Sequence, residues 1–282
     1  MSFIYPSYSD WTTFDRANGL LYSHGRLCEL VYPELWEGCV CGIHTQSDFR
    51  DWSKLGNHGT NTSGVLETTE YFHTGSSSGY VAISDDDSLD VANITISMWI
   101  RTTDGAGTTR RYFAAKSPGS GTSGFMFNKE NAANFMRIIV GTGSLNQVEW
   151  GDATTFDGIW HHHLFTYDGT DIVAYRDGDQ QASSSPSAGD MTGGTEPLHI
   201  GEYAGGGTGN TIDAEMAYFQ MYNRAISKQE IASQCENWGT AWLIRPLRRY
   251  FVSGGAPPTG SPSPRTNIQG PLVGPFGGPI NA

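Results

Sequence analysis

Three groups of side chains in this 282-residue sequence have the types and spacing to bind a metal ion or to take part in acid–base chemistry. They are the histidines at positions 161–163, the aspartates within positions 85–90, and the pair Asp213 and Glu215. Histidines two positions apart on a strand point to the same side and could share a metal ion, and clustered carboxylates could bind calcium. Two nearby carboxylates could serve as an acid and a base. The elements that carry these residues help to decide among these possibilities.

The histidines lie in the stretch with the clearest strand pattern. Residues 160–167 (WHHHLFTY) alternate with large side chains on both faces, and the alternation resumes at residue 172 after a DGT turn. A second Asp-Gly turn follows at positions 177 and 178. The pattern predicts two antiparallel strands, joined by a tight turn, inside a sheet that packs on another layer. Histidines in such strands are better explained as core or interstrand residues than as metal ligands.

The four acids Asp85, Asp86, Asp87 and Asp90 precede a predicted strand at 94–102. Their spacing does not match an EF-hand loop, and acids in a turn usually face the solvent. We therefore predict no cofactor, with a calcium ion in this turn as the alternative.

Charge and hydropathy exclude two classes of partner. The chain has 17 Lys and Arg against 29 Asp and Glu, a formal net charge of −12. Such a surface repels phosphates, so we expect no nucleic-acid ligand. No apolar run approaches the roughly 20 residues that span a bilayer, and no export signal is recognisable at the N-terminus. We expect no membrane partner.

The four cysteines, Cys28, Cys39, Cys41 and Cys235, show no zinc-ligand spacing. Cys39 and Cys41 would point to the same side of one strand, a poor geometry for a disulfide between them. We expect unpaired, partly buried thiols.

Several segments resemble those of one known family. The hairpin is similar to the W-H-H-x-x-x-x-Y-D-G...Y-x-D-G pattern of concanavalin A-like lectin/glucanase domains, in their laminin-G and pentraxin-like branch. Residues 51–60 (DWSKLGNHGT), 71–83 and 214–231 (AEMAYFQMYNRAISKQEI) resemble further segments in the family's order, although Lys54 stands where Gly is usual. The resemblance implies an all-β fold, an antiparallel two-sheet β-sandwich of the concanavalin A-like jelly-roll type. One short helix and extended terminal arms complete the expected architecture.

Three regions follow from composition and pattern. Residues 1–35 are predicted to form an N-terminal arm or irregular cap, residues 36–252 the sandwich, and residues 253–282 a Pro/Gly-rich C-terminal arm. A first strand is expected at 35–43 (LWEGCVCGI). Asp51 and His58 are interpreted as anchors of a tight turn. Ser227 with Glu230 forms a capping box, which predicts a helix from Lys228 to about residue 237.

We expect no catalysis. Retaining glucanases of the family carry E-x-D-x-E on one strand, because two carboxylates must form and break a glycosyl intermediate. The nearest match is TIDAE at 211–215, where Thr211 replaces the nucleophile and has no evident activating base. A divergent glycosidase is the weakest of our hypotheses.

The C-terminal arm holds 7 Pro and 7 Gly in 30 residues, a composition that cannot bury enough surface to fold alone. Its apolar residues are spaced as anchors for a groove on a neighbouring subunit. The alternative is docking onto its own domain. The predicted partner-binding residues are Arg265, Ile268, Leu272, Val273, Phe276 and Ile280.

A sandwich of this family usually works outside the cell, yet this chain shows no export signal and has arms suited to assembly. Phage structural proteins resemble this combination. We therefore hypothesise a virion structural protein, a bacteriophage capsid decoration or cement subunit made in the host cytoplasm, with other copies of itself and a capsid protein as partners. The alternative is an extracellular, secreted or surface glycan-binding module, possibly calcium-dependent.

Overall fold

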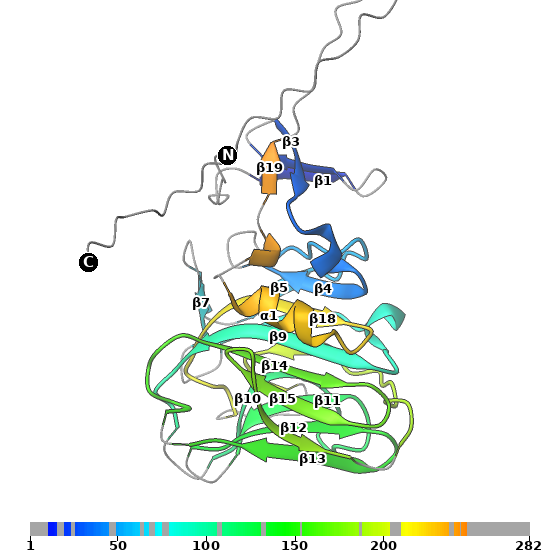
Figure 1. Cartoon of the computed structure of the whole chain (residues 1–282), viewed down its shortest axis with the longest axis vertical. Coiled ribbons are helices and arrows are strands. Elements are labelled where there is room, and N and C mark those ends of the chain that lie inside the picture. The colour runs from blue at the N-terminus through cyan, green and yellow to red at the C-terminus, as the bar shows by residue number, and fades with distance from the viewer. Residues whose placement is uncertain are drawn as a thin grey trace, which may run out of the picture. The chain divides into compact units, whose positions relative to one another are not determined.

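The fold was analysed in a computed structural model (Figure 1), which describes residues 11–15, 20–23, 26–44, 49–62, 65–67, 71–74, 79–105, 109–130, 134–152, 154–185, 188–203, 210–236, 240–242 and 244–246. The chain divides into two compact units, Met1–Leu247 and Arg248–Ala282. All described residues belong to the first unit. The predicted partner-binding residues from Arg265 to Ile280 therefore lie outside the described residues.

Two large antiparallel sheets form the sandwich that the sequence predicts. The first has seven strands in the order β13-β12-β11-β10-β17-β8-β5. Their bounds are β5 Gly59–Thr62, β8 Tyr80–Ile83, β10 Arg111–Lys116, β11 Phe125–Lys129, β12 Met136–Gly141, β13 Leu145–Trp150 and β17 Leu198–Ile200.

The second large sheet has eight strands, seven of them in the order β16-β15-β14-β9-β18-β7-β6, and the eighth, β4, pairs with β18. Their bounds are β4 Cys39–Ile43, β6 Leu66–Glu67, β7 Phe72–His73, β9 Ile94–Arg101, β14 His161–Tyr167, β15 Ile172–Arg176, β16 Asp179–Ser184 and β18 Glu215–Tyr222.

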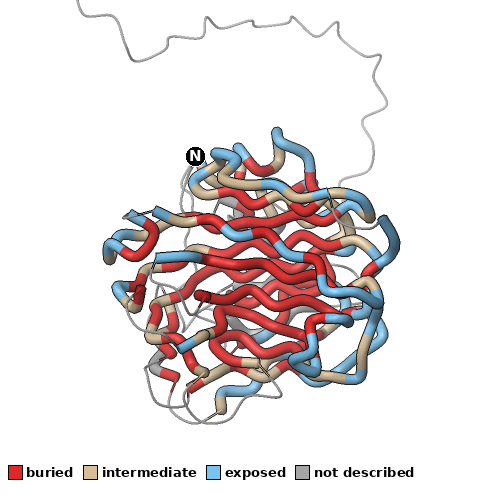
Figure 2. The backbone as a smooth tube through the Cα atoms, turned by 90° about the horizontal axis from the view of Figure 1, so that it is seen from below, coloured by how far each residue is buried: buried red, intermediate tan, exposed pale blue. Residues whose placement is uncertain are grey.

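The core lies between these two sheets. Alternate residues of β9, from Ile94 to Ile100, belong to it as the period of two predicts. Aromatic rings from facing sheets meet there, such as Phe125 and Phe165 with centroids 6.0 Å apart. Burying one such side chain contributes about 1.5–3 kcal/mol. Figure 2 shows the buried residues running along the central strands, with exposed residues concentrated at the turns.

The central hairpin forms as predicted from residues 160–178. Strand β14 pairs with β15 from Tyr167↔Ile172 onward, and Asp168 Oδ1 accepts the backbone N–H of Asp171 (2.8 Å) in the turn. At the next reversal, Asp177 and Gly178 have φ of 53° and 86°. Two positive φ values are the signature of the type I′ turn that Asp-Gly favours. Local residue chemistry therefore sets this part of the sheet.

The N-terminal region is more regular than the sequence indicated. Instead of only an arm or irregular cap, it contains β1 (Trp11–Asp15), β2 (Leu20–Ser23) and β3 (Arg26–Leu30), which form a small antiparallel sheet with β19 (Ile244–Pro246) in the order β1-β2-β3-β19. The partner strand β19 is more than 200 residues away in the sequence, so no local pattern indicates the pairing.

Short helices complete the described structure. The expected first strand begins later than predicted, because Leu35 and Trp36 lie in the 3₁₀ helix η2 (Pro33–Trp36). Two other 3₁₀ helices are η3 (Asp87–Leu89) and η4 (Thr240–Trp242). The predicted α-helix, α1, spans Lys228–Cys235 with both capping-box hydrogen bonds present. Ile231 on α1 packs against residues of the eight-stranded sheet.

The capping box yields a stability prediction. Replacing Ser227 by Ala removes the hydroxyl that accepts the backbone N–H of Glu230, and should lower the free energy of unfolding by about 1 kcal/mol. Urea unfolding monitored by circular dichroism measures the change. The exposed helix position Gln229→Ala is the matched control and should leave the midpoint nearly unchanged. Equal midpoints for wild type and S227A would contradict the capping role.

Candidate functional site

His162 and His163 pack on opposite faces of β14, His163 toward the core between the sheets and His162 beneath α1. His162 and His163 are buried, and the ring of His163 lies 6.5 Å from that of Trp150. The Ser97 hydroxyl donates to Gln234 Oε1, so Nε2 of His162 donates to Ser97 (2.8 Å). These contacts confirm the interpretation as core and interstrand histidines.

A cysteine lies on the other side of the same imidazole. Nδ1 of His162 accepts the Cys235 thiol at 2.8 Å. Burial raises the pKa of Cys235 to about 12 and lowers the pKa of His162 to about 4, so both groups are neutral at pH 7. A thiol without thiolate character is a poor nucleophile. Cys39, Cys41 and Cys235 are unpaired, as predicted for these three.

The acidic turn makes structural contacts. Lys116 Nζ lies 2.6 Å from Asp85 and 2.9 Å from Asp90, and Asp86 accepts the backbone N–H of Ser88 at the start of η3. Three of the four aspartates therefore have protein partners. Within the described ranges, no group of three or more His, Cys, Asp or Glu side chains is arranged to hold a metal ion.

Asp51 anchors its turn in the way the sequence predicts. Its carboxylate accepts backbone N–H groups from Gly42 (2.8 Å), Ser53 (2.8 Å) and Asn57 (2.7 Å). Nδ1 of His58 accepts the backbone N–H of Asp51 at 3.0 Å. These bonds occupy both residues in holding the chain reversal, and they confirm the structural interpretation.

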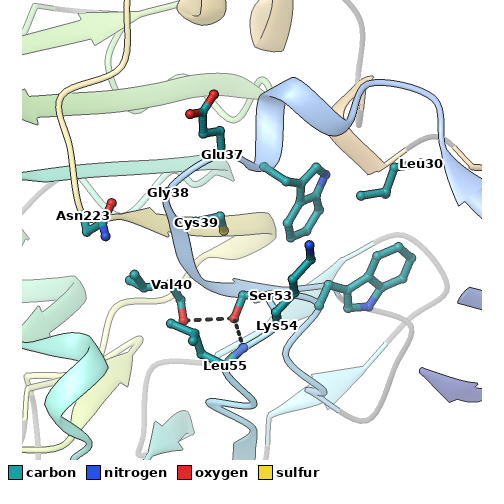
Figure 3. Close-up of a pocket in the computed structure, with 11 residues that line it drawn as sticks. Leu30, Glu37, Gly38, Cys39, Val40, Ser53, Lys54, Leu55 and Asn223 are labelled. Carbon is teal, nitrogen blue, oxygen red and sulfur yellow. Dashed lines mark hydrogen bonds between the residues drawn. The ribbon is translucent and has the colours of Figure 1, made fainter. Parts of the chain in front are cut away.

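An apolar pocket of about 330 Å³ lies beside this turn (Figure 3). The hydroxyl of Ser53 fixes one wall, because it donates to the Val40 carbonyl (3.0 Å) and accepts the backbone N–H of Leu55 (3.2 Å). Lys54, the departure from the family pattern, contributes to the lining. The remaining lining residues are Leu30, Trp36, Glu37, Gly38, Cys39, Trp52 and Asn223.

A second, polar cleft of about 280 Å³ forms where β7, β9 and β18 meet. In register, Glu215 of β18 lies between His73 of β7 and Arg101 of β9. Side chains directly opposite on neighbouring strands are close enough to interact. The residues that line this polar cleft are His73, Arg101, Thr102, Thr103, Asp104, Gly158, Asp213, Ala214 and Glu215.

Ion pairs hold the charged side chains of the polar cleft in place. Arg101 Nε donates to Glu215, and this hydrogen bond raises the pKa of the Arg101 guanidinium. Arg111 donates to Asp104, whose Oδ2 also accepts the backbone N–H of Asp213 (3.2 Å). These contacts hold the guanidinium and carboxylate groups of the cleft in fixed positions.

Aromatic rings flank the polar cleft at Arg101. The guanidinium carbon lies 5.4 Å from the ring centroid of Tyr71 and 5.1 Å from that of Trp160. Both distances are within the range of a cation–π contact. The two rings are half-buried, with centroids 5.6 Å apart. The two rings are not in the cleft lining, but they lie against Arg101, which is, so partly exposed aromatic surface adjoins the hydrogen-bonding groups.

Sequence reasoning found only part of this site. It singled out Asp213 and Glu215, and both line the polar cleft. Thr211, which replaces a carboxylate in the glucanase pattern, is buried away at 1% exposure. The sequence analysis assigned no role to His73, Arg101 or Asp104. His73 and Arg101 end strands β7 and β9, and Asp104 lies in the turn after β9; many residues share such positions.

The comparisons with known proteins agree with the sandwich. A model of the concanavalin A-like lectin/glucanases superfamily matches residues 74–232. The chain belongs to this superfamily. The match confirms the resemblance of the hairpin and of the segment at 214–231. Among curated protein sequences, none matches this chain significantly.

Solved structures similar to this superfamily member include binding domains of toxins. The binding domain of Paraclostridial Mosquitocidal Protein 1 aligns with a TM-score of 0.57 and 18% identity over 70% of this chain and 52% of that one. The receptor binding domain of botulinum neurotoxin C/D mosaic serotype gives 0.54 and 12%, over 70% and 50%. The botulinum neurotoxin DC binding domain in complex with SialylT gives 0.55 and 12%, over 70% and 51%. The chain spans about half the length of these proteins, and the likeness shows the fold.

The buried histidines predict a stability that falls in acid. Burial lowers the pKa of His44 to about 3 and of His162 to about 4, while an unfolded histidine titrates near about 6.5. Below that pH the unfolded chain binds protons that the folded chain does not, so the free energy of unfolding should fall between about pH 6.5 and 4.

The measurement is urea unfolding of wild type and His162→Gln across this pH range. His162 alone should contribute about 3 kcal/mol to the loss, since one pKa unit corresponds to about 1.4 kcal/mol. The H162Q curve should therefore be flatter. Parallel curves would contradict a neutral His162 in the folded state.

Proposed function

We propose that the chain is a carbohydrate-binding module whose ligand occupies the polar cleft. The observation that carries the proposal is the combination of the half-buried rings of Tyr71 and Trp160 with the charged side chains fixed between β7, β9 and β18. A sugar presents apolar C–H faces and a ring of hydroxyls. It therefore needs aromatic surface together with closely placed donors and acceptors.

The charged groups retain hydrogen-bonding capacity for hydroxyls. A carboxylate offers about four lone-pair positions, and Asp213 uses one of them with His73 Nε2 at 2.6 Å. Arg101 has five N–H donors, of which Nε is directed to Glu215. Hydroxyls can use the remaining positions without breaking the existing pairs.

The ion pairs also favour binding by pre-organisation. Ordering a long side chain on binding costs about 0.5–1.5 kcal/mol. In the polar cleft Arg101 is already held by Glu215 and the two rings, and Arg111 by Asp104. Most of this cost is therefore met during folding, and more of the contact energy appears as affinity.

The comparisons support this proposal over our main sequence-based hypothesis. The superfamily model is named for lectins and glucanases, and the similar solved structures are binding domains, one of them in complex with SialylT. The capsid decoration hypothesis, with other copies and a capsid protein as partners in a virion, rests on the terminal arms, the lack of a recognisable export signal and the resemblance to phage structural proteins. Its anchor residues lie outside the described part of the chain. The extracellular binding module, our alternative, is the function that the cleft favours.

Removing the aromatic surface tests the proposal. Trp160→Ala should weaken glycan binding by about tenfold or more, because truncating an aromatic residue central to a binding site typically costs ~2 kcal/mol. A glycan array identifies the ligand, and isothermal titration calorimetry measures the affinity. The control is the neighbouring Ile159→Ala, a 62% exposed side chain that is not one of the two rings against Arg101. Unchanged affinity in W160A, with an intact circular dichroism spectrum, would reject the cleft as the site.

Chelation separates this proposal from a calcium-dependent lectin. The acids of the polar cleft are paired with Arg101, Arg111 and His73, so EDTA should leave the affinity for the identified glycan unchanged. Calorimetry before and after dialysis against EDTA provides the measurement. Loss of binding that calcium restores would instead support the calcium-dependent alternative.

A further inference from the structure

The guanidinium groups of the polar cleft are shared unequally among its carboxylates. Three carboxylates line it, those of Asp104, Asp213 and Glu215. Two guanidinium groups face them: Arg101, in the lining, and Arg111, which contacts Asp104. These cations, together with Lys129, whose ammonium interacts electrostatically with Asp104, are directed to Asp104 and Glu215 rather than to Asp213.

Both guanidinium groups are committed to other partners. Arg111 pairs with Asp104, and Arg101 pairs with Glu215. The rings of Tyr71 and Trp160 also lie against Arg101. A carboxylate on a ligand would therefore approach guanidinium groups whose positive charge Glu215 or Asp104 already offsets.

Asp213 is the carboxylate without a guanidinium partner. Its Oδ1 lies 2.6 Å from His73 Nε2, the side-chain partner that the described residues provide for this carboxylate. The Asp213 side chain is 46% exposed, against 22% for Glu215 and 16% for Asp104. The carboxylate without a guanidinium partner is thus also the most exposed of the three in the cleft lining.

We propose that the cleft selects amino sugars with a free, protonated amine, which Asp213 recognises, and that it disfavours sugars bearing carboxylates. This inference rests on the proposed glycan-binding function and specifies its ligand class. A primary ammonium group offers Asp213 a positive charge and three N–H donors. The net charge of −12 also opposes an anionic polysaccharide and favours a cationic one.

Three tetrasaccharides of equal length provide the test by calorimetry with the full chain at about pH 6, where most of the sugar amines are protonated: a β-1,4-glucosamine oligomer, its N-acetylated form, and a β-1,4-linked uronic acid oligomer. The amine form should bind about twofold to fivefold more tightly than the acetylated form, the range expected for an exposed ion pair. The uronic acid form should bind most weakly. At about 0.5 M salt, exposed charges are largely screened, so the difference in affinity between the amine form and the acetylated form should shrink.

Substitutions assign this preference to one residue. Asp213→Asn keeps an acceptor for His73 and should abolish the advantage of the amine while the acetylated oligomer still binds. Asp213→Glu keeps the charge and should retain part of the advantage. Asp87→Asn is the matched control, because it removes one negative charge from an exposed position outside the cleft and should preserve the preference.

The outcomes distinguish the two proposals. If the acetylated and amine forms bind equally well, or if D213N and D87N behave alike, the amine preference is overturned while glycan binding stands. Tightest binding of the uronic acid form also overturns it. If none of these oligomers binds and a glycan array is blank, the proposed function itself fails.

Discussion

The rest of the structure depends on one constraint: strand β18 must pair with three other strands at once. Along one edge it pairs with β9, and along the other it pairs with β7 at its start and β4 at its end. The register with β9 shifts between Ala217 and Gln220, and Tyr218 in this irregularity has φ of 56°. A bulge of this kind re-aims side chains locally. It separates the polar cleft, before the bulge, from the packed face after it.

The packed face shows how closely this sheet is covered. Tyr218 joins a cluster of aromatic side chains with Trp52 and Trp242, and Trp36 packs on the backbone of Gly42. A Cβ atom at Gly42 would lie 2.6 Å from the Trp36 ring, so a side chain there would displace the indole. The segment before the sandwich and the one after it are thereby held on one face. The half-buried rings of Tyr71 and Trp160 pack at the edge of the same cluster and lie against Arg101 of the polar cleft.

Ion pairs in the cleft affect geometry more than stability. The Arg101–Glu215 pair is 36% and 22% exposed, and exposed pairs of this kind typically contribute at most about 1 kcal/mol. Their main consequence is to hold charged atoms at fixed positions beside aromatic surface. This arrangement suits a binding site, whose ligand then meets groups that are already ordered. It also commits the cations, which leaves Asp213 as the carboxylate that a ligand can reach and neutralise.

The sequence by itself determined those features that depend on a few consecutive residues. The alternation at 160–167, the Asp-Gly turn at 177–178 and the Ser227–Glu230 cap specify their backbone conformations locally, and the structure confirms each of them. The family segments added the two-layer architecture. Only the tertiary structure decided the small sheet and the polar cleft. Arg101, His73 and Asp213 come from separate strands and loops, and no local pattern records which strand ends will meet. Their meeting follows from strand order and register, which the burial of the whole core sets.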